Sequence, residues 1–247
     1  MTPLTSIDLN SLPIPIHFGE NAISQLGRIA REAGGTRALL ITDHGVRGAG
    51  HIDQAEVFLR AAGLEVVVFD DVHENPTTLD VDACVSAARA CDADLLIGIG
   101  GGSSMDAAKG CNFLLSNGGR MQDYWGVDKA THAMLPFIAV PTTAGTGSEC
   151  QRFALISDAE THQKMACGDP KAAALCAILD PVLTLTQPAF VTACTGTDAI
   201  VHAVETAVTR VATNASLAYS HEAFRLLVAN ISTVLAAPDD VQARAAM

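Results

Sequence analysis

Basic residues are scarce in this chain. Its 247 residues include 15 Lys and Arg against 27 Asp and Glu, which gives a formal net charge of −12 at pH 7. Nucleic-acid binding needs a basic face for the phosphates, and anionic membrane surfaces also attract basic segments. The composition therefore argues against both kinds of partner. A phosphorylated small molecule is still compatible with it, because backbone N–H groups can bind phosphate.

Long apolar segments and paired cysteine motifs are also absent. The apolar runs have the length of single strands, so we expect no transmembrane helix. Met1 to Asn10 contain neither a basic region nor an apolar core, which predicts no secretory leader. The seven Cys are an odd number without a Cys-x-x-Cys pair, which argues against a disulfide framework or a thiolate zinc site. A cytoplasmic location is the expectation.

The apolar pattern that is present alternates between strands and helices. A hydrophobic content of 49% is ample for a large core. Strands apolar along their whole length, each followed by a helix, indicate a parallel sheet covered on both faces. The strands are expected at residues 13–18 (an edge strand), 37–42, 64–69, 94–99, 135–140 and 172–179. The helices are expected at 22–33, 54–62, 79–90 and 103–116, with a hairpin within 153–166.

From Pro188 onward the sequence has helical character and is rich in Ala and Val. About sixty residues are too few for an independent helical core. We therefore expect two domains, an α/β domain at residues 1–188 and an incomplete helical domain at 189–247. The helical domain should pack on the α/β domain or on residues outside this chain.

A glycine-rich turn is the first candidate for a binding site. The segment Gly100-Gly-Gly-Ser-Ser-Met-Asp-Ala-Ala-Lys109 follows an expected strand and opens a helix. Glycines let the backbone approach a pyrophosphate, and free N–H groups at the helix start bind it. The segment is neither a P-loop nor the G-x-G-x-x-G of the usual dinucleotide fold. The competing interpretation is a tight turn with Ser103 as the helix cap.

Asp43 follows the expected strand at 37–42. An acidic residue at such a strand end can accept a hydrogen bond from a ribose 2′-hydroxyl and repel a 2′-phosphate, which would favour NAD over NADP. A cap on the next turn explains the same residue. Arg47 lies nearby and could weaken the discrimination. The loops Glu74-Asn-Pro-Thr77 and Thr142-Thr-Ala-Gly-Thr146 also follow expected strands, where ligands of α/β sheets bind, although ordinary turns have the same composition.

Asp198 and His202 are the candidate metal ligands. On a helix this i, i+4 pair shares one face, and a carboxylate with an imidazole suits Fe(II), Zn(II) or a similar ion. From spacing alone, a surface pair is the commoner explanation. Glu205 is better explained as a solvated carboxylate, and nothing in the sequence fixes the position of His221.

Together, four ordered segments closely resemble the iron-containing alcohol dehydrogenases. They are Gly100 to Lys109, Pro141-Thr-Thr-Ala-Gly-Thr-Gly-Ser-Glu149, Leu179-Asp-Pro181 and Thr195-Gly-Thr-Asp-Ala-Ile-Val-His-Ala-Val-Glu205. The resemblance extends from about Ile16 to the end. It implies a parallel-sheet α/β dinucleotide-binding domain followed by the start of an all-helical domain, the architecture also seen in dehydroquinate synthases.

The resemblance also implies roles for individual residues. Asp198 and His202 would be the first two metal ligands and the catalytic pair, with Fe(II) preferred and Zn(II) as the alternative. Asp43 would face the adenosine ribose of NAD. The other cofactor contacts would be Gly101, Gly102 and Ser103 at the pyrophosphate, Asn75, Thr142, Thr143 and Thr146 along the cleft, Lys164 near the ribose, and Asp106 toward the nicotinamide. An alcohol, diol or aldehyde would be the substrate, and a homodimer or larger homo-oligomer the assembly.

The chain departs from the family in one respect. The family pattern supplies two more histidine ligands from helices further along, in a segment that this chain lacks. A catalytically incomplete NAD-binding fragment is therefore one alternative to an active dehydrogenase. A zinc-dependent polyol dehydrogenase or a dehydroquinate-synthase relative is another, although the segments at residues 141–146 and 195–199 fit the iron type better.

Overall fold

The computed structural model describes Asp8 and residues 12–247. The expectation about Met1 to Asn10 lies, apart from Asp8, outside the described residues. Within the described part, no helix is both long and apolar enough to cross a membrane. The seven cysteines are all unpaired, and four of them are buried like small apolar residues.

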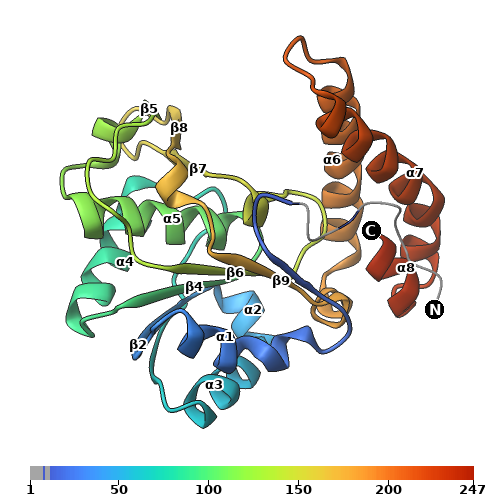
Figure 1. The fold of residues 1–247 in the computed structure, drawn as a ribbon. Coiled ribbons are helices and arrows are strands. Elements are labelled where there is room, and N and C mark those ends of the chain that lie inside the picture. The colour runs from blue at the N-terminus through green and yellow to red at the C-terminus, as the bar shows by residue number, and fades with distance from the viewer. Residues whose placement is uncertain (1–7, 9–11) are drawn as a thin grey trace.

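A parallel sheet of six strands forms the centre of the α/β part (Figure 1). Its spatial order is β1-β9-β6-β4-β2-β3, and every neighbouring pair runs parallel. The expected edge strand is confirmed, because β1 lies at one end of the sheet. The strand bounds are β1 Ile16–Phe18, β2 Arg37–Ile41, β3 Glu65–Phe69, β4 Leu95–Gly100, β6 Phe137–Pro141 and β9 Cys176–Leu179.

Helices cover both faces of this sheet, as the uniformly apolar strands predict. Successive side chains of a strand point to opposite faces. Accordingly, Leu39 and Ile41 belong to one core cluster with α4 and α5, while Leu40 belongs to the other with α1 and α3. The bounds of these helices are α1 Leu26–Glu32, α3 His51–Ala61, α4 Thr78–Ala90 and α5 Gly102–Asn117.

A small second sheet packs beside α5. The expected hairpin is confirmed, because β7 (Phe153–Ser157) pairs antiparallel with β8 (Lys164–Gly168). The short β5 (Gly126–Val127) adds a parallel strand, which gives the order β5-β8-β7. Gly110 of α5 lies against this sheet, since a Cβ there would come within 3.4 Å of Ile156.

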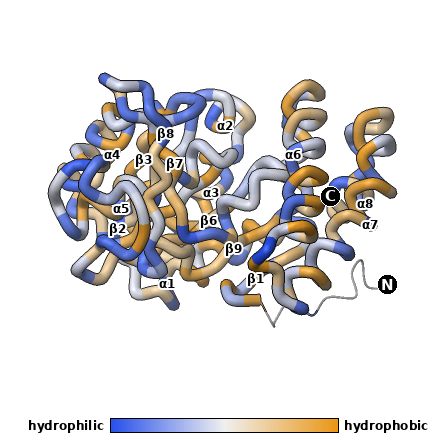
Figure 2. Tube along the Cα trace, turned by 90° about the horizontal axis from the view of Figure 1, so that it is seen from above, coloured by the Kyte–Doolittle hydropathy of each residue, from blue (hydrophilic) through white to orange (hydrophobic). Residues whose placement is uncertain are grey.

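The last segment forms a separate helical layer, seen at the right of Figure 1. It consists of α6 (Ala189–Val208), α7 (Asn214–Ala236) and the short α8 (Val241–Ala246). Gly196 allows close packing of α6, because a Cβ there would lie 2.4 Å from Ile231 of α7. Apolar residues run along α6 and α7 in Figure 2. Several large ones are exposed: Val201, Val204, Val208, Phe224, Val228 and Leu235. The division into two domains at residue 188 stays a prediction.

Several element bounds differ from expectation. The strand expected over residues 172–179 was too long, because Pro170–Ala172 forms the 3-10 helix η5 and only Cys176–Leu179 pairs in the sheet. The expected helix at 22–33 begins as the 3-10 helix η2 (Ala22–Gln25) before α1. The short helix α2 (His44–Gly48) was missed, since its five residues show no apolar period. Other 3-10 turns are η3 Met121–Tyr124, η4 Ser148–Cys150 and η6 Pro181–Thr186.

Candidate functional site

The glycine turn between β4 and α5 is closely packed at Gly100 and Gly102. Gly100 has a φ of +150°, and a Cβ on it would lie 2.3 Å from Ser104 Oγ. A Cβ on Gly102 would come within 3.2 Å of Thr146 Oγ1. Gly101 is different, because its nearest neighbour would be Thr143 at 3.6 Å, an ordinary contact distance. The turn therefore exposes backbone, not side chains, to the space in front of α5.

Two hydroxyls at this turn and in the loop beside it have no hydrogen-bond partner among the described residues. Gly101 is the N-cap of α5 and provides no side-chain cap, so Ser103 does not cap the helix. The hydroxyls of Ser104 and Thr143 are buried without a hydrogen-bond partner among the described residues. Buried polar atoms are nearly always satisfied, so unpaired ones at a helix start call for a polar ligand or water. These donors fit the phosphates of a dinucleotide.

The second polar loop lies directly against the first. Because β6 pairs with β4, Pro141 is opposite Gly100, and the N–H of Thr142 donates to the carbonyl of Gly100 at 2.9 Å. The side chains of Thr143 and Thr146 then lie over Gly101 and Gly102. The structure thus brings together two sequence segments, residues 100–104 and 142–146, that the sequence placed only at strand ends.

Asn75 and Lys164 join the same cluster from two other elements. The N–H of Asn75 donates to Ser103 Oγ at 3.2 Å, and Lys164 Nζ donates to Asn75 Oδ1 at 3.2 Å. Asn75 has a φ of +54°, a backbone conformation that Asn tolerates better than most residues. The loop after β3 and the start of β8 therefore both reach the start of α5.

Asp43 serves as a cap and also faces the glycine turn. Its Oδ1 accepts a hydrogen bond from the N–H of Val46 at 2.9 Å, which fixes the start of α2. Its Oδ2 would lie 3.5 Å from a Cβ on Gly100. The capping interpretation is therefore correct, and the second oxygen is still directed toward the glycine turn.

Asp106 lies one helical turn below this surface, inside the protein. Its Oδ1 accepts a hydrogen bond from Ser148 Oγ at 2.7 Å and lies 3.7 Å from the Nζ of Lys109. Burial raises the pKa of Asp106, against the charge of Lys109, and burial lowers the pKa of Lys109, against the charge of Asp106. The side chain thus supports the loop at residue 148.

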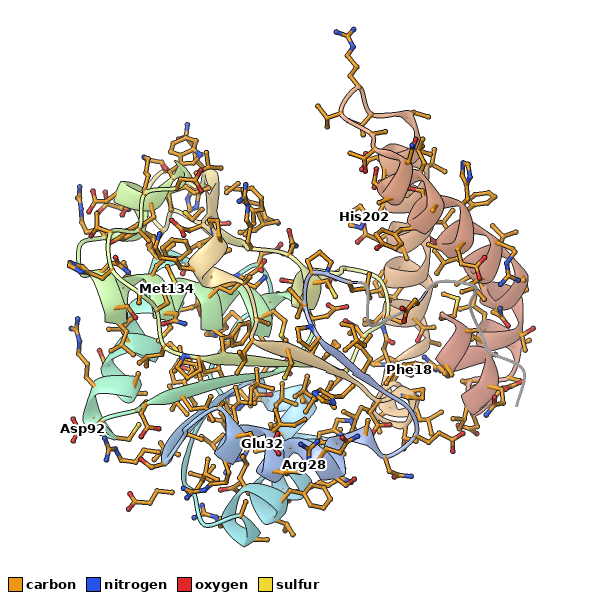
Figure 3. The ribbon with its side chains drawn as sticks, viewed as in Figure 1. Phe18, Arg28, Glu32, Asp92, Met134 and His202 are labelled. Carbon is orange, nitrogen blue, oxygen red and sulfur yellow. The ribbon has the colours of Figure 1, made fainter. Side chains whose placement is uncertain are left out.

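Asp198 and His202 share a face of α6, as their spacing predicts. The His202 Nε2 and Asp198 Oδ1 atoms are 3.7 Å apart, and both side chains are about half exposed. Figure 3 shows His202 on the side of α6 that faces the α/β part. It borders a cavity of about 570 Å³ between α6, α7 and the loop at residues 145–150. Gly145 brings that loop onto α6, because a Cβ there would lie 2.1 Å from the carbonyl oxygen of Thr195.

The donor set on α6 fits part of a divalent metal site. One carboxylate oxygen and one imidazole nitrogen on the same face are suitable ligands for iron or zinc. A catalytic zinc site uses three protein ligands and keeps one open position. No group of three or more His, Cys, Asp or Glu residues suited to a metal occurs among the described residues. His221 does not line the cavity.

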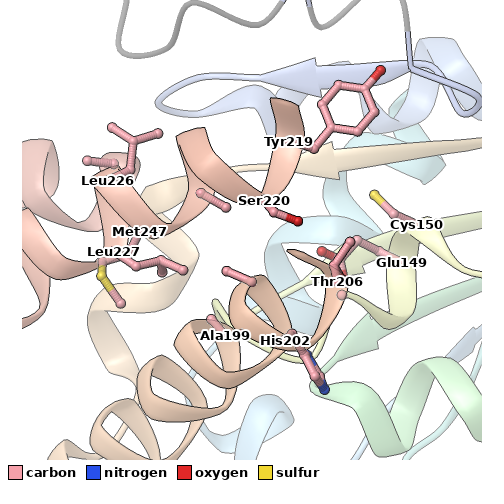
Figure 4. A pocket seen from close by; sticks show the side chains of 15 residues that line it. Glu149, Cys150, Ala199, His202, Thr206, Tyr219, Ser220, Leu226, Leu227 and Met247 are labelled. Atoms are coloured by element: carbon pink, nitrogen blue, oxygen red, sulfur yellow. The ribbon is translucent and has the colours of Figure 1, made fainter. Parts of the chain in front are cut away.

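The cavity contains polar groups that the sequence did not single out. Figure 4 shows Glu149 and Cys150 from the loop beside Thr206 of α6, with Tyr219 and Ser220 of α7 nearby; His202 lines the same cavity. Burial raises the pKa of Glu149. Desolvation, with the charge of Glu149, raises the pKa of the Cys150 thiol to about 12. The one sequence signal for Glu149 as a residue of this cavity was its position at the end of the Thr-rich loop.

Comparison with known proteins agrees with this geometry. A sequence model described as iron-containing alcohol dehydrogenase matches residues 13–181. The NAD-dependent methanol dehydrogenase of Bacillus methanolicus is 35% identical over 230 residues, which are 93% of this chain and 60% of the relative.

Solved structures give the same result. The crystal structure of a 1,3-propanediol oxidoreductase superposes with a TM-score of 0.92 at 35% identity, covering 95% of this chain and 61% of that one. Sulfoacetaldehyde reductase from Bifidobacterium kashiwanohense, in complex with NAD+, gives a TM-score of 0.87 at 28% identity, covering 96% and 62%. The chain thus spans about 60% of the length of these relatives. On the family match over more than half of its length, this chain belongs to the iron-containing alcohol dehydrogenases.

Proposed function

We propose that this chain binds NAD in front of α5 and contributes to the transfer of a hydride between a primary or secondary alcohol, or a diol, and the nicotinamide. The names of the relatives support an alcohol or diol as substrate. The NAD dependence of the methanol dehydrogenase, and the NAD+ bound to the sulfoacetaldehyde reductase, support the cofactor.

One observation carries the proposal. Two glycine- and threonine-rich loops converge on the uncapped start of a 16-residue helix, and two buried hydroxyls there have no partner in the described structure. This arrangement is suited to a pyrophosphate, because backbone N–H groups and hydroxyls can bind it at the positive end of the helix.

The other cofactor contacts follow from the positions of the side chains. Asp43 Oδ2 would accept a hydrogen bond from the adenosine ribose, and the Asn75–Lys164 pair would bind near the second ribose. Thr143 and Thr146 would enclose the pyrophosphate against Gly101 and Gly102. These residues position the cofactor, and the hydride chemistry belongs to the nicotinamide.

Asp198 and His202 would hold a divalent cation, Fe(II) by preference and Zn(II) as the alternative. When bound, such an ion supplies a Lewis acid that polarises an alcohol or carbonyl oxygen. His202 borders the cavity between α6, α7 and residue 149, which has space for a small substrate. A cytoplasmic location and a homodimer or larger homo-oligomer belong to the same proposal.

A second function is favoured by one observation. With only two metal-binding residues on α6, the described part of the chain provides an incomplete ligand set. A protein that binds NAD without turnover would have this structure. Alcohol-dependent NADH formation by the chain, after anaerobic Fe(II) loading and across short alcohols and diols, separates the two functions.

The binding site is tested with Gly101→Ala. The φ of −81° at Gly101 and its open surroundings accept a methyl group, so the fold should be unchanged. The methyl group would lie in contact with Thr143, on the backbone surface of the turn where we place the pyrophosphate. We expect the Kd of NADH to rise by a factor of about ten or more, measured by calorimetry.

Gly48→Ala is the matched control, because Gly48 at the far end of α2 also has open space around it. Its Kd and melting temperature should match those of the parent chain. The cofactor site would be wrong if Gly101→Ala bound NADH as tightly as the control does.

A further inference from the structure

A cluster of charged side chains lies where β2 and β3 end. The two strands pair in register, with Ile41 opposite Phe69, so the residues that follow them are neighbours. Asp43 follows β2, whereas Asp70 and Asp71 follow β3. His44 of α2 faces these carboxylates, with its Nδ1 3.4 Å from Asp70 Oδ2 and its Nε2 3.6 Å from Asp71 Oδ1.

Arg47 is held by one member of this cluster. Its Nη1 donates to Asp70 Oδ2 at 2.6 Å. The hydrogen bond to Asp70 raises the pKa of Arg47 and lowers that of Asp70, with further attraction of the guanidinium by Asp53 and Glu56 of α3. Among the described residues Arg47 forms no ion pair with Asp43. The guanidinium is therefore directed toward Asp70, at the end of β3.

The position of Arg47 matters for the choice of cofactor. The N–H of Arg47 donates to the carbonyl of Asp43 at 3.0 Å, so the two residues are one helical turn apart. An Arg within reach of the adenosine ribose binds the 2′-phosphate of NADP, and a planar guanidinium is well suited to that group. Asp43 does not neutralise Arg47, because the two side chains form no ion pair in the described structure. A cation therefore lies one helical turn from the proposed ribose site. The hydrogen bond from Nη1 to Asp70 Oδ2 orients the guanidinium, so Arg47 has to leave this pair to present its planar face to a 2′-phosphate.

We propose that Asp70 is a specificity-determining residue, which disfavours NADP by holding Arg47 away from the position of the 2′-phosphate. This inference rests on the proposed binding of NAD in front of α5. Discrimination then depends on two carboxylates from adjacent strands. Asp43 repels the 2′-phosphate of NADP, and Asp70 keeps Arg47, the one arginine of α2, in an ion pair.

The test is Asp70→Asn in the full chain, with the Kd values of NADH and NADPH measured by calorimetry at constant ionic strength. Releasing Arg47 should lower the ratio of the NADPH Kd to the NADH Kd about fivefold, the size of one exposed ion pair. Asp71→Asn is the matched control, because it removes the same charge next to His44 and leaves the Arg47–Asp70 pair intact. Its ratio should change by less than about twofold, as expected for a screened surface charge.

The double variant Asp70→Asn/Arg47→Ala assigns the effect to the arginine. With Arg47 absent, Asp70→Asn should no longer change the ratio. Equal effects of Asp70→Asn and Asp71→Asn, an unchanged ratio in Asp70→Asn, or a persistent effect without Arg47 would each overturn the inference. If the parent chain binds neither NADH nor NADPH, the proposed function itself has failed, which is a different result.

Discussion

Lys109 is the most constrained single residue near the site. Its side chain is completely buried, and its ammonium group donates to the carbonyl and hydroxyl of Ser148 and to the carbonyl of Phe153. Asp106 is the nearby carboxylate. A buried charge of this kind is tolerated only when it is paired and hydrogen-bonded. The cation therefore ties the loop that carries Thr143 and Thr146 to α5.

Lys109→Met should destabilise the protein by about 3 kcal/mol, because it leaves Asp106 buried with no cation and removes the partner of two backbone carbonyls. Urea unfolding monitored by circular dichroism measures the change. Lys129→Met, at an exposed position, should change the stability by less than about 0.5 kcal/mol.

The double variant Lys109→Met/Asp106→Asn should recover part of the loss, since it removes the unpaired carboxylate as well. If Lys109→Met unfolds at the same urea concentration as Lys129→Met, then the buried pair has no structural role.

At the scale of elements, the start of α4 determines the position of Asn75. The N–H and hydroxyl of Thr77 both donate to Asp80 Oδ2 at 2.7 Å, and His73 Nδ1 lies 2.6 Å from Asp80 Oδ1. Asp80 thus holds both ends of the segment that contains Asn75. The hydrogen bond to Asp80 raises the pKa of His73. Burial opposes ionisation of Asp80, but the hydrogen bonds from Thr77 and His73 together lower its pKa.

These shifts predict how stability depends on pH. The raised pKa of His73 means that its contribution is complete below the ordinary histidine value of about 6.5 and is lost as the pH rises through the raised value. The lowered pKa of Asp80 means that its contribution is present above about pH 4 and is lost as the pH falls through the lowered value.

The free energy of unfolding of the parent chain minus that of His73→Gln should therefore be largest near pH 5 to 6 and shrink toward about pH 8. Urea unfolding at a series of pH values provides the measurement. His132→Gln is the control, because His132 forms no ion pair within the described residues. A difference that does not vary with pH would contradict this account of the start of α4.

At the scale of the whole molecule, the proposed chemistry depends on how two parts face each other. Gly145 packs onto Thr195 of α6, and this contact places the loop at residues 145–150 on one side of the cavity and His202 on the other. The relatives are longer than this chain, which spans about 60% of their length. Binding of NADH to the chain can therefore be measured separately from turnover, because the proposed cofactor contacts all lie in the α/β part.

Asp198→Ala and His202→Ala should each reduce the affinity for Fe(II) or Zn(II) and bring alcohol-dependent NADH formation below detection. The Kd of NADH should stay within about twofold, because neither side chain contacts the glycine turn. Calorimetry with the metal alone, and separately with NADH, distinguishes these effects.

Glu205 is exposed and lies one turn further along α6. Glu205→Gln should leave the metal affinity, the rate of NADH formation and the Kd of NADH unchanged. Unaltered metal affinity in both Asp198→Ala and His202→Ala would remove the metal assignment.

The sequence by itself determined the local features of this protein. Strands that are apolar throughout predict a parallel sheet covered on both sides, and the i, i+4 spacing places Asp198 and His202 on one face of α6. Gly100 to Lys109, after the strand predicted at residues 94–99, likewise predicts a tight turn and the start of a helix. Each of these features depends on residues close together in the chain, where periodicity and backbone freedom are sufficient to decide the outcome.

Only the tertiary structure decided which of these segments meet. The contact of Thr143 with Gly101, the Asn75–Lys164 pair, the burial of Lys109 and the Arg47–Asp70 pair each join residues from different elements. A pattern within one segment cannot specify such partners, because strand order and helix packing set them. The second role of Asp43, and the supporting role of Asp106, follow from neighbours supplied by the fold. The physical reason is that the energy of a polar group depends on its burial and its partners.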